Sequence, residues 1–253
     1  MSVEIFSPRS RDEWLAIRRT TIGASEVASL LGANPYMSAY ELFMHKTGAI
    51  PPVEETGAMR RGRHLESVAI EMLREEFPDW SVEANPMPRG RFYRDIAIGA
   101  SCTPDAFVEA PGRPNGRCQI KSVHKAAFAK AWKTESGEVE PPTYVAVQAI
   151  QEAALTGADW CCVAALVIDW SIELHVIDVP IHRGLIERIE REIVGFWDRV
   201  NRNDPYAPDY GSDGAIIAGL YPDDNGSTVD LTDDNELPEI AAEDLRLDRK
   251  SVV

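Results

Sequence analysis

Two adjacent apolar segments set the first limit on the fold. Residues 160–168 and 172–179 are rich in β-branched and aliphatic side chains, and a polar triplet at 169–171 separates them. This pattern predicts a β-hairpin. The longest apolar run, residues 160–170, is much shorter than the roughly 20 residues that a membrane-spanning helix needs, and it already contains Asp169. We therefore expect a globular domain with a β-sheet and no membrane segment.

Apolar residues recur at helical spacing on both sides of a group of shorter, β-rich segments. The segments that we expect to be helical are residues 14–19, a short helix capped by Ser25 and ended by Gly32, and residues 39–46, 62–77, 126–132, 143–156 and 185–200. The segments that we expect to be strands are residues 91–97, 101–108 and 117–123, in addition to the hairpin. Helices, then a small sheet, then helices predict a mixed α/β core.

The acidic charge is concentrated toward the C-terminal end. The 253 residues are 44% hydrophobic, which is enough for a sizeable core, and carry a formal net charge of -15. Residues 204–253 hold 13 Asp and Glu against 3 Lys and Arg. The stretch 204–235 is rich in Pro, Gly, Asp and Asn, which is typical of a loosely ordered segment. We therefore expect a domain at 1–203 and an acidic extension at 204–253. The net charge argues against delocalised binding to nucleic acid but leaves room for a local basic channel.

Several classes of protein are disfavoured by what the sequence lacks. The N-terminal residues contain no apolar core of a secretory signal, so we expect a cytoplasmic protein. The four Cys residues have no CxxC spacing, and we expect them to be buried small hydrophobes in a reducing cytosol. The five His residues form no HxH or HExxH pattern, which disfavours a zinc site. No GxxxxGK[ST] loop and no GxSxG turn is present, so ATP hydrolysis and acyl transfer by a serine are not expected.

A carboxylate and a lysine on two predicted strands suggest chemistry on phosphodiesters. If the strands are neighbours, Asp105 faces Gln119 and Lys121, which share one face of their strand because they are two residues apart. A carboxylate with nearby carbonyls, such as that of Ile120, suits Mg²⁺. The metal would polarise a phosphate and acidify a water, and the ammonium would orient that water or screen the phosphate. Taken alone, the pattern also fits a surface Asp and Lys beside a hairpin.

Further residues strengthen the case for a nuclease site. Glu66 on the predicted helix 62–77 is a candidate second carboxylate, and Asp95 on the preceding strand is a candidate third. Arg18 and Ser25 lie before and at the start of a predicted helix, an arrangement suited to a terminal phosphate. Gln148 lies on the predicted helix before the hairpin.

These residues belong to an ordered series of motifs. The motifs are Trp14-x-x-x-Arg18, Thr21-Ile22-Gly23-Ala24-Ser25-Glu26-Val27, Asn34-Pro35-Tyr36, Gly62-Arg63-His64-Leu65-Glu66, Tyr93-Arg94-Asp95, Pro104-Asp105, Gln119-Ile120-Lys121, and Tyr144-x-x-x-Gln148 before Thr156-Gly157. In this order the chain resembles the YqaJ-type viral recombinases, the family that includes phage lambda exonuclease, within the PD-(D/E)xK nuclease superfamily. The resemblance covers about residues 10–200. It implies a restriction-endonuclease-like α/β core, in which helices flank a small mixed sheet, followed here by the acidic C-terminal extension.

The resemblance also implies a role for each candidate residue. The implied roles are central metal ligand for Asp105, second ligand position for Gln119, carbonyl ligand for Ile120, catalytic lysine for Lys121, further acids of the metal site for Glu66 and Asp95, binding of a 5′-phosphate for Arg18 and Ser25, and orientation of active-site groups for Gln148. The implied activity is a Mg²⁺-dependent exonuclease, with Mn²⁺ as a substitute, that degrades linear duplex DNA from its ends in the 5′ to 3′ direction. The implied setting is phage-type recombination in a bacterial host cytosol, as a homotrimer working with a single-strand annealing protein.

One departure from the family pattern leaves two functions open. The family normally has Glu or Asp where this chain has Gln119. An amide oxygen can ligate a metal, but it brings no charge and should weaken Mg²⁺ binding. An active nuclease is the first hypothesis, and a catalytically weakened protein that binds DNA ends on the same fold is the second. A nicking or structure-selective endonuclease is a third.

Overall fold

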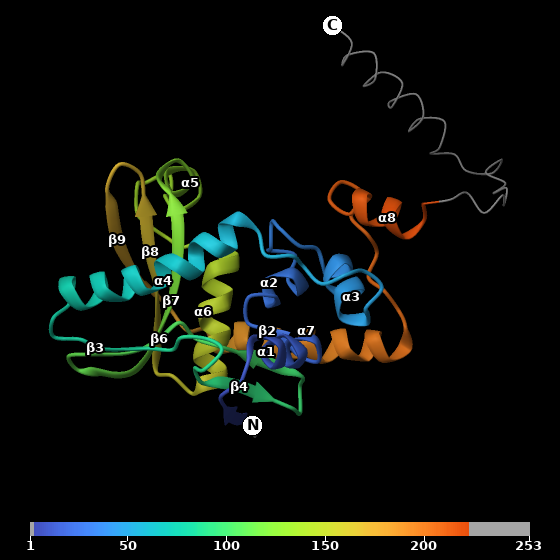
Figure 1. The fold of residues 1–253 in the computed structure, drawn as a ribbon, viewed down its shortest axis with the longest axis horizontal. Helices are drawn as coiled ribbons and strands as arrows, with labels where there is room; N and C mark the ends of the chain where they lie inside the picture. The colour runs from blue at the N-terminus through green and yellow to red at the C-terminus, as the bar shows by residue number, and fades with distance from the viewer. Residues whose placement is uncertain (1–2, 223–253) are drawn as a thin grey trace, which may run out of the picture. The chain divides into compact units, whose positions relative to one another are not determined.

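Nine strands form two sheets in residues 3–222, the part of the chain that the computed structural model describes (Figure 1). The four-stranded sheet has the order β1-β4-β5-β2, and the five-stranded sheet has the order β3-β6-β7-β8-β9. The strand bounds are β1 (Val3–Phe6), β2 (Ile22–Gly23), β3 (Ser81–Ala84), β4 (Phe92–Asp95), β5 (Ala100–Cys102), β6 (Ala106–Ala110), β7 (Arg113–His124), β8 (Trp160–Ile168) and β9 (Ile172–Val179). Both sheets mix parallel and antiparallel pairs, with β2–β5 and β7–β8 parallel.

Several helices of the described residues begin at a capping side chain or end at a glycine. Their bounds are α1 (Arg11–Arg19), α2 (Val27–Leu30), α3 (Ala39–Thr47), α4 (Gly57–Glu76), α5 (Lys125–Ala131), α6 (Thr143–Thr156), α7 (Arg183–Arg202) and α8 (Gly214–Leu220). Ser10, Ser38 and Thr56 cap the N-termini of α1, α3 and α4 by accepting backbone N–H bonds. Gly48 and Gly157 end α3 and α6 in the left-handed conformation that a side chain disfavours. None of these helices combines the length and the apolar character that a membrane crossing needs.

The five-stranded sheet is covered by helices on both faces. On one face, Ile70 and Leu73 of α4 belong to the same hydrophobic cluster as Leu166 of β8, and Figure 1 shows α4 lying across β7, β8 and β9. On the other face, Val145 of α6 packs in a cluster with Val163 of β8. Side chains on both faces of β8 are therefore buried. This explains why its sequence is continuously apolar and does not alternate between apolar and polar residues.

The strongest sequence patterns are confirmed. The hairpin is formed by β8 and β9 as an antiparallel pair with the predicted bounds, and α6 matches the predicted helix 143–156. The mixed α/β class is also confirmed. All four Cys residues are free and buried.

Three expectations about local structure are corrected. The predicted strand 101–108 is two strands, β5 and β6, which belong to different sheets. Pro104 lies in the connection between them, where its missing N–H group costs no ladder bond. Ser25 does not cap a helix, because α2 begins at Val27 and its N-cap residue is Glu26. The helix predicted at 62–77 begins earlier, at Gly57, because Thr56 supplies the cap.

The acidic extension falls largely outside the described residues. The first of the two units into which the chain divides ends at Ile216. Within the first unit, Asp213 is fully buried, and it accepts hydrogen bonds from the Ser38 hydroxyl (2.7 Å) and the Asp209 N–H (2.8 Å). The first residues of the expected extension are therefore anchored to the N-terminus of α3. The prediction of a loosely ordered segment also covers residues 223–235, which lie outside the described part of the chain.

Candidate active site

The register of two strands places Asp105 beside Gln119. In the antiparallel pair of β6 and β7, Ala106 lies opposite Cys118. The same register places Asp105, which directly precedes β6, opposite Gln119. The buried Asn85 fixes the backbone of this segment. Its N–H donates to the Asp105 carbonyl (2.9 Å), and its Nδ2 donates to the Pro104 carbonyl (2.8 Å). The predicted meeting of these two strands is therefore observed.

The Asp105 carboxylate is held by donors from β7. Its Oδ2 accepts from the Ile120 N–H at 2.7 Å and from the Gln119 Nε2. Burial raises the pKa of Asp105 to about 6, although the Lys121 charge and the Ile120 N–H bond oppose that rise. The neighbouring cation and the backbone donor thus keep the carboxylate available near neutral pH.

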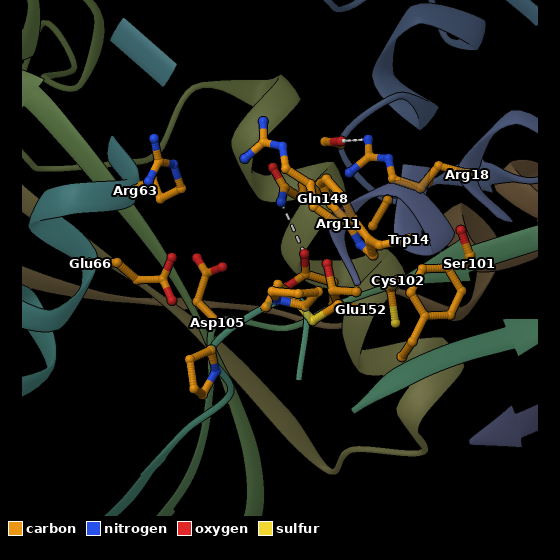
Figure 2. A pocket seen from close by; sticks show the side chains of 18 residues that line it. Arg11, Trp14, Arg18, Arg63, Glu66, Ser101, Cys102, Asp105, Gln148 and Glu152 are labelled. Carbon is orange, nitrogen blue, oxygen red and sulfur yellow. Dashed lines mark hydrogen bonds between the residues drawn. The ribbon is translucent and has the colours of Figure 1, made fainter. Parts of the chain in front are cut away.

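Glu66 of α4 brings a second carboxylate to the same place. Figure 2 shows the Glu66 and Asp105 carboxylates pointing toward each other across the pocket. Burial raises the pKa of Glu66 to about 8, and the charge of Asp105 contributes to that rise. Two carboxylates that repel each other in this way form a site that favours a cation.

A chain of side-chain amides links Lys121 to Asp105. The Lys121 Nζ donates to the Gln148 Oε1 (2.8 Å), and the Gln148 Nε2 donates to the Gln119 Oε1 (2.8 Å). The Gln119 Nε2 then donates to Asp105 and to the Ile120 carbonyl (3.1 Å). The direction of the chain follows from its ends, because an ammonium only donates and a carboxylate only accepts.

The donor set fits a hard divalent cation with few protein ligands. Glu66, Asp105 and the Ile120 carbonyl supply oxygens, which Mg²⁺ prefers, and Mg²⁺ commonly takes only one or two carboxylates and keeps its waters. Within residues 3–222, no group of three or more His, Cys, Asp or Glu side chains is placed so that it could hold a metal ion. Gln119 presents its nitrogen to Asp105, so its oxygen reaches a cation only after a half-turn of the amide.

Asp95 lies apart from this group. It is buried in β4 of the other sheet, and its Oδ1 accepts from the Ala97 N–H at 2.9 Å in the turn that follows. It is not among the residues that line the pocket. Its carboxylate stabilises a turn, and we leave it out of the proposed ligand set.

Arg18 and Ser25 lie in the same pocket as the carboxylates. The pocket has a volume of about 390 Å³ and is lined by both residues as well as by Glu66, Asp105 and Gln148. An Arg18 nitrogen donates to the Ser25 hydroxyl at 3.2 Å, and the guanidinium lies 4.8 Å from the Trp14 ring centroid. The guanidinium and the hydroxyl can bind a phosphate together, one as a cation and the other as a hydrogen-bond donor.

Glu26 forms ion pairs with Arg18 and with Lys46. Its carboxylate lies 3.7 Å from Arg18 and 2.8 Å from the Lys46 ammonium. Burial alone would raise the pKa of Glu26, but Lys46 and Arg18 lower it below the usual value. Because Lys46 offsets the charge of Glu26, Arg18 retains attraction for an anion.

Several pocket residues were not predicted from the sequence. Arg11, Arg63 and Glu152 line the pocket (Figure 2), as do Ser101 and Cys102. Glu152 lies one helical turn after Gln148, a spacing that puts the two on one face of α6 and was the signal available in the sequence. Burial raises the pKa of Glu152 well above its usual value.

Comparisons with known proteins identify the family and the fold. The family model of the YqaJ-like viral recombinase domain matches residues 13–159. Protein D345L of African swine fever virus is 40% identical over 129 residues, 50% of this chain and 37% of the relative. The uncharacterized protein YqaJ of Bacillus subtilis is 41% identical over 63 residues, 24% of this chain and 20% of the relative. The matched segments thus span well under half the length of these relatives.

Solved structures of exonucleases share the fold. An alkaline exonuclease from Laribacter hongkongensis superposes with a TM-score of 0.57 at 21% identity, covering 81% of this chain and 98% of that one. A putative exonuclease from Eubacterium rectale superposes with a TM-score of 0.54 at 10% identity, covering 88% and 97%. The fold is that of these exonucleases, and the chain belongs to the YqaJ-like viral recombinase domain family.

Proposed function

We propose that the protein is a metal-dependent deoxyribonuclease that degrades linear duplex DNA from its ends. The observation that carries the proposal is that Glu66 and Asp105 line one pocket with Arg18 and Ser25. Lys121 is tied to this pocket because its ammonium donates to Gln148, which also lines it. Two carboxylates and a lysine suit hydrolysis of a phosphodiester, and an arginine with a hydroxyl suits a terminal phosphate. The Laribacter relative in fold is named an alkaline exonuclease, and one of its structures is a complex with dAMP.

Separate residues would bind the metal and assist the reaction. Glu66, Asp105 and the Ile120 carbonyl would hold Mg²⁺, with Mn²⁺ as a substitute. When bound, the metal supplies charge to a phosphate oxygen and lowers the pKa of a water. The Lys121 ammonium donates a hydrogen bond to Gln148. From there it would orient the attacking water or stabilise the developing negative charge on the phosphate.

Arg18 and Ser25 would hold the 5′-phosphate of the strand end. The guanidinium offers parallel N–H groups that match two phosphate oxygens, and the hydroxyl adds a further donor. Placing the terminal phosphate here sets which bond lies next to the carboxylates, and degradation then proceeds 5′ to 3′. This direction, like the choice of DNA ends, is part of the proposal.

The wider setting is also proposed. We infer recombination by single-strand annealing, with an annealing protein as partner, in the cytosol of a bacterial host. A homotrimer would let a basic inner surface coexist with the acidic charge of the whole chain. The division into a nuclease domain at 1–203 and an acidic extension at 204–253 belongs to the same proposal.

A DNA-end-binding protein without nuclease activity is the second candidate. Gln119 favours it, because an amide replaces a carboxylate and its nitrogen faces Asp105. The two candidates share a pocket and differ in whether linear DNA is cut.

The test is digestion of end-labelled linear duplex with Mg²⁺, with and without a 5′-phosphate. We expect degradation of linear DNA, loss of activity with EDTA, and no cutting of an intact circular duplex. Asp105→Asn should lower the rate about 1000-fold, the factor that corresponds to about 4 kcal/mol of lost transition-state stabilisation. Asp95→Asn is the matched control, because it changes a buried aspartate outside the pocket and should keep the activity.

Three results would contradict the proposal. Binding of DNA ends without cutting at any Mg²⁺ or Mn²⁺ concentration would favour the second candidate. Cutting of the circular duplex would indicate an endonuclease. Equal losses in Asp105→Asn and Asp95→Asn would remove the assignment of Asp105.

A further inference from the structure

Glu152 is a buried acid at the active site that the chemistry described above does not use. Its side chain is 1% exposed, lies on α6 and lines the pocket beside Gln148 (Figure 2). Its Oε1 accepts from the Gln148 Nε2 at 3.0 Å. Its Oε2 has no hydrogen-bond partner within the described part of the chain. Burying a carboxyl with one oxygen unpaired destabilises a fold, so packing alone does not explain this residue.

The hydrogen bonds of Gln148 define what Glu152 does. The Gln148 oxygen faces the Lys121 ammonium, so its nitrogen must face acceptors. The two hydrogens of that nitrogen are used by the Gln119 Oε1 and the Glu152 Oε1. Glu152 thus supplies the second of two acceptors that hold the Gln148 amide in one orientation.

We propose that Glu152 is a positioning residue: it holds the Gln148 amide, and Gln148 in turn holds the Lys121 ammonium and the Gln119 amide. This role rests on the proposed nuclease function. In the described residues, the side-chain hydrogen bond of Glu152 is made with Gln148, and Gln148 in turn contacts Lys121, so the hydrogen-bonded link from Glu152 to Lys121 runs through Gln148. Without this acceptor the Gln148 amide is free to turn, and Lys121 loses the oriented acceptor for its ammonium.

The test replaces the acceptor while keeping the volume. In Glu152→Met, we expect kcat on linear duplex to fall roughly 10-fold, the lower end of the effect of removing a supporting partner at a metal site. KM for DNA ends should not change, because Glu152 does not contact the proposed phosphate site. Glu152→Gln keeps an oxygen that accepts from Gln148, and it should restore kcat to near the wild-type value.

A second readout reports on Lys121 without any nuclease activity. Metal-free protein is acetylated with an amine-reactive ester, and the labelling rate of each lysine is measured by peptide mass spectrometry. We expect Lys121 in Glu152→Met to react roughly twofold faster or more, the lower end of the coupling within one hydrogen-bond network. Lys125, which is exposed and pairs with Asp169 at 3.6 Å, is the internal reference and should label equally in all variants.

Gln151→Met is the matched control variant. Gln151 is the neighbouring residue on α6, is equally buried, and also has an unpaired side-chain oxygen, but it does not line the pocket. It should leave both kcat and Lys121 labelling unchanged. A wild-type protein without nuclease activity would refute the proposed function, while the labelling experiment would still decide the role of Glu152.

Clear outcomes overturn the proposal. Glu152→Met with wild-type kcat and wild-type Lys121 labelling would show that Glu152 positions nothing. Equal changes in Gln151→Met would show a general effect of altering α6. A Glu152→Met protein that melts below the wild type or does not fold also counts against it, because an acid retained for the site must be dispensable for folding.

Discussion

The facing carboxylates predict a metal affinity that rises steeply with pH. Glu66 and Asp105 have pKa values raised to about 8 and about 6, mainly by burial. A divalent cation binds to ionised carboxylates, so each proton that must leave lowers the apparent affinity. The affinity is therefore lost as the pH falls through these two values and is complete only above about pH 8.

The size of the effect follows from the two pKa values. At pH 6, Glu66 is about 1% ionised and Asp105 about half ionised; at pH 8, Glu66 is about half ionised and Asp105 almost fully. These changes multiply to a gain of about 100-fold in apparent affinity between pH 6 and pH 8. The gain corresponds to about 2.7 kcal/mol, at about 1.36 kcal/mol for each factor of ten.

Isothermal titration calorimetry with Mg²⁺ at pH 6, 7 and 8 measures this dependence. In buffers of different ionisation enthalpy, the same experiment counts the protons released on binding. Glu66→Gln removes the group with the higher pKa, so its remaining pH dependence should be about twofold, from Asp105 alone. An affinity that does not vary with pH in the wild type would refute the reasoning, and so would an undiminished pH dependence in Glu66→Gln.

Three further predictions concern single residues. Gln119→Glu should lower the Mg²⁺ concentration needed for half-maximal digestion and change little at saturation, and identical Mg²⁺ curves would show that Gln119 does not contact the metal. Arg18→Ala should reduce the preference for 5′-phosphorylated over 5′-hydroxyl ends in competition digests, and an unchanged preference would exclude Arg18 from the phosphate site. Gly116→Ala should lower the free energy of unfolding by about 1–3 kcal/mol in urea titrations, because a methyl group there would overlap the Trp160 indole. Gly184→Ala, whose added methyl meets open space, is its control and should not be destabilised.

Parts of the fold with strong local patterns could be predicted from the sequence. The bounds of α6, β8 and β9 follow from long apolar runs ended by Gly157 and by a polar turn. The short strand β1 carried no such signal, because it has four residues and pairs with β4 some 90 positions later. Its structure is fixed by a distant partner and not by its own sequence.

The same distinction applies to the candidate site. Asp105 and Gln119 could be placed together because a short antiparallel connection sets their register. Asp95 could not be placed, because β4 belongs to the other sheet and the nearest donor to its carboxylate is in the following turn. Glu152 escaped prediction because an acid on a helix usually faces water, and only the packing of α6 against the strands shows that this one is buried.

The connection from β5 to β6 has a mechanical consequence for the enzyme that we propose. Only three residues, Thr103 to Asp105, join a strand of one sheet to a strand of the other. An extended residue spans about 3.3 Å, and a link of this length therefore has almost no slack. Sliding of one sheet against the other, even by a fraction of that length, would pull Asp105 away from Gln119. Heating should therefore inactivate the protein at a lower temperature than the one at which either sheet melts.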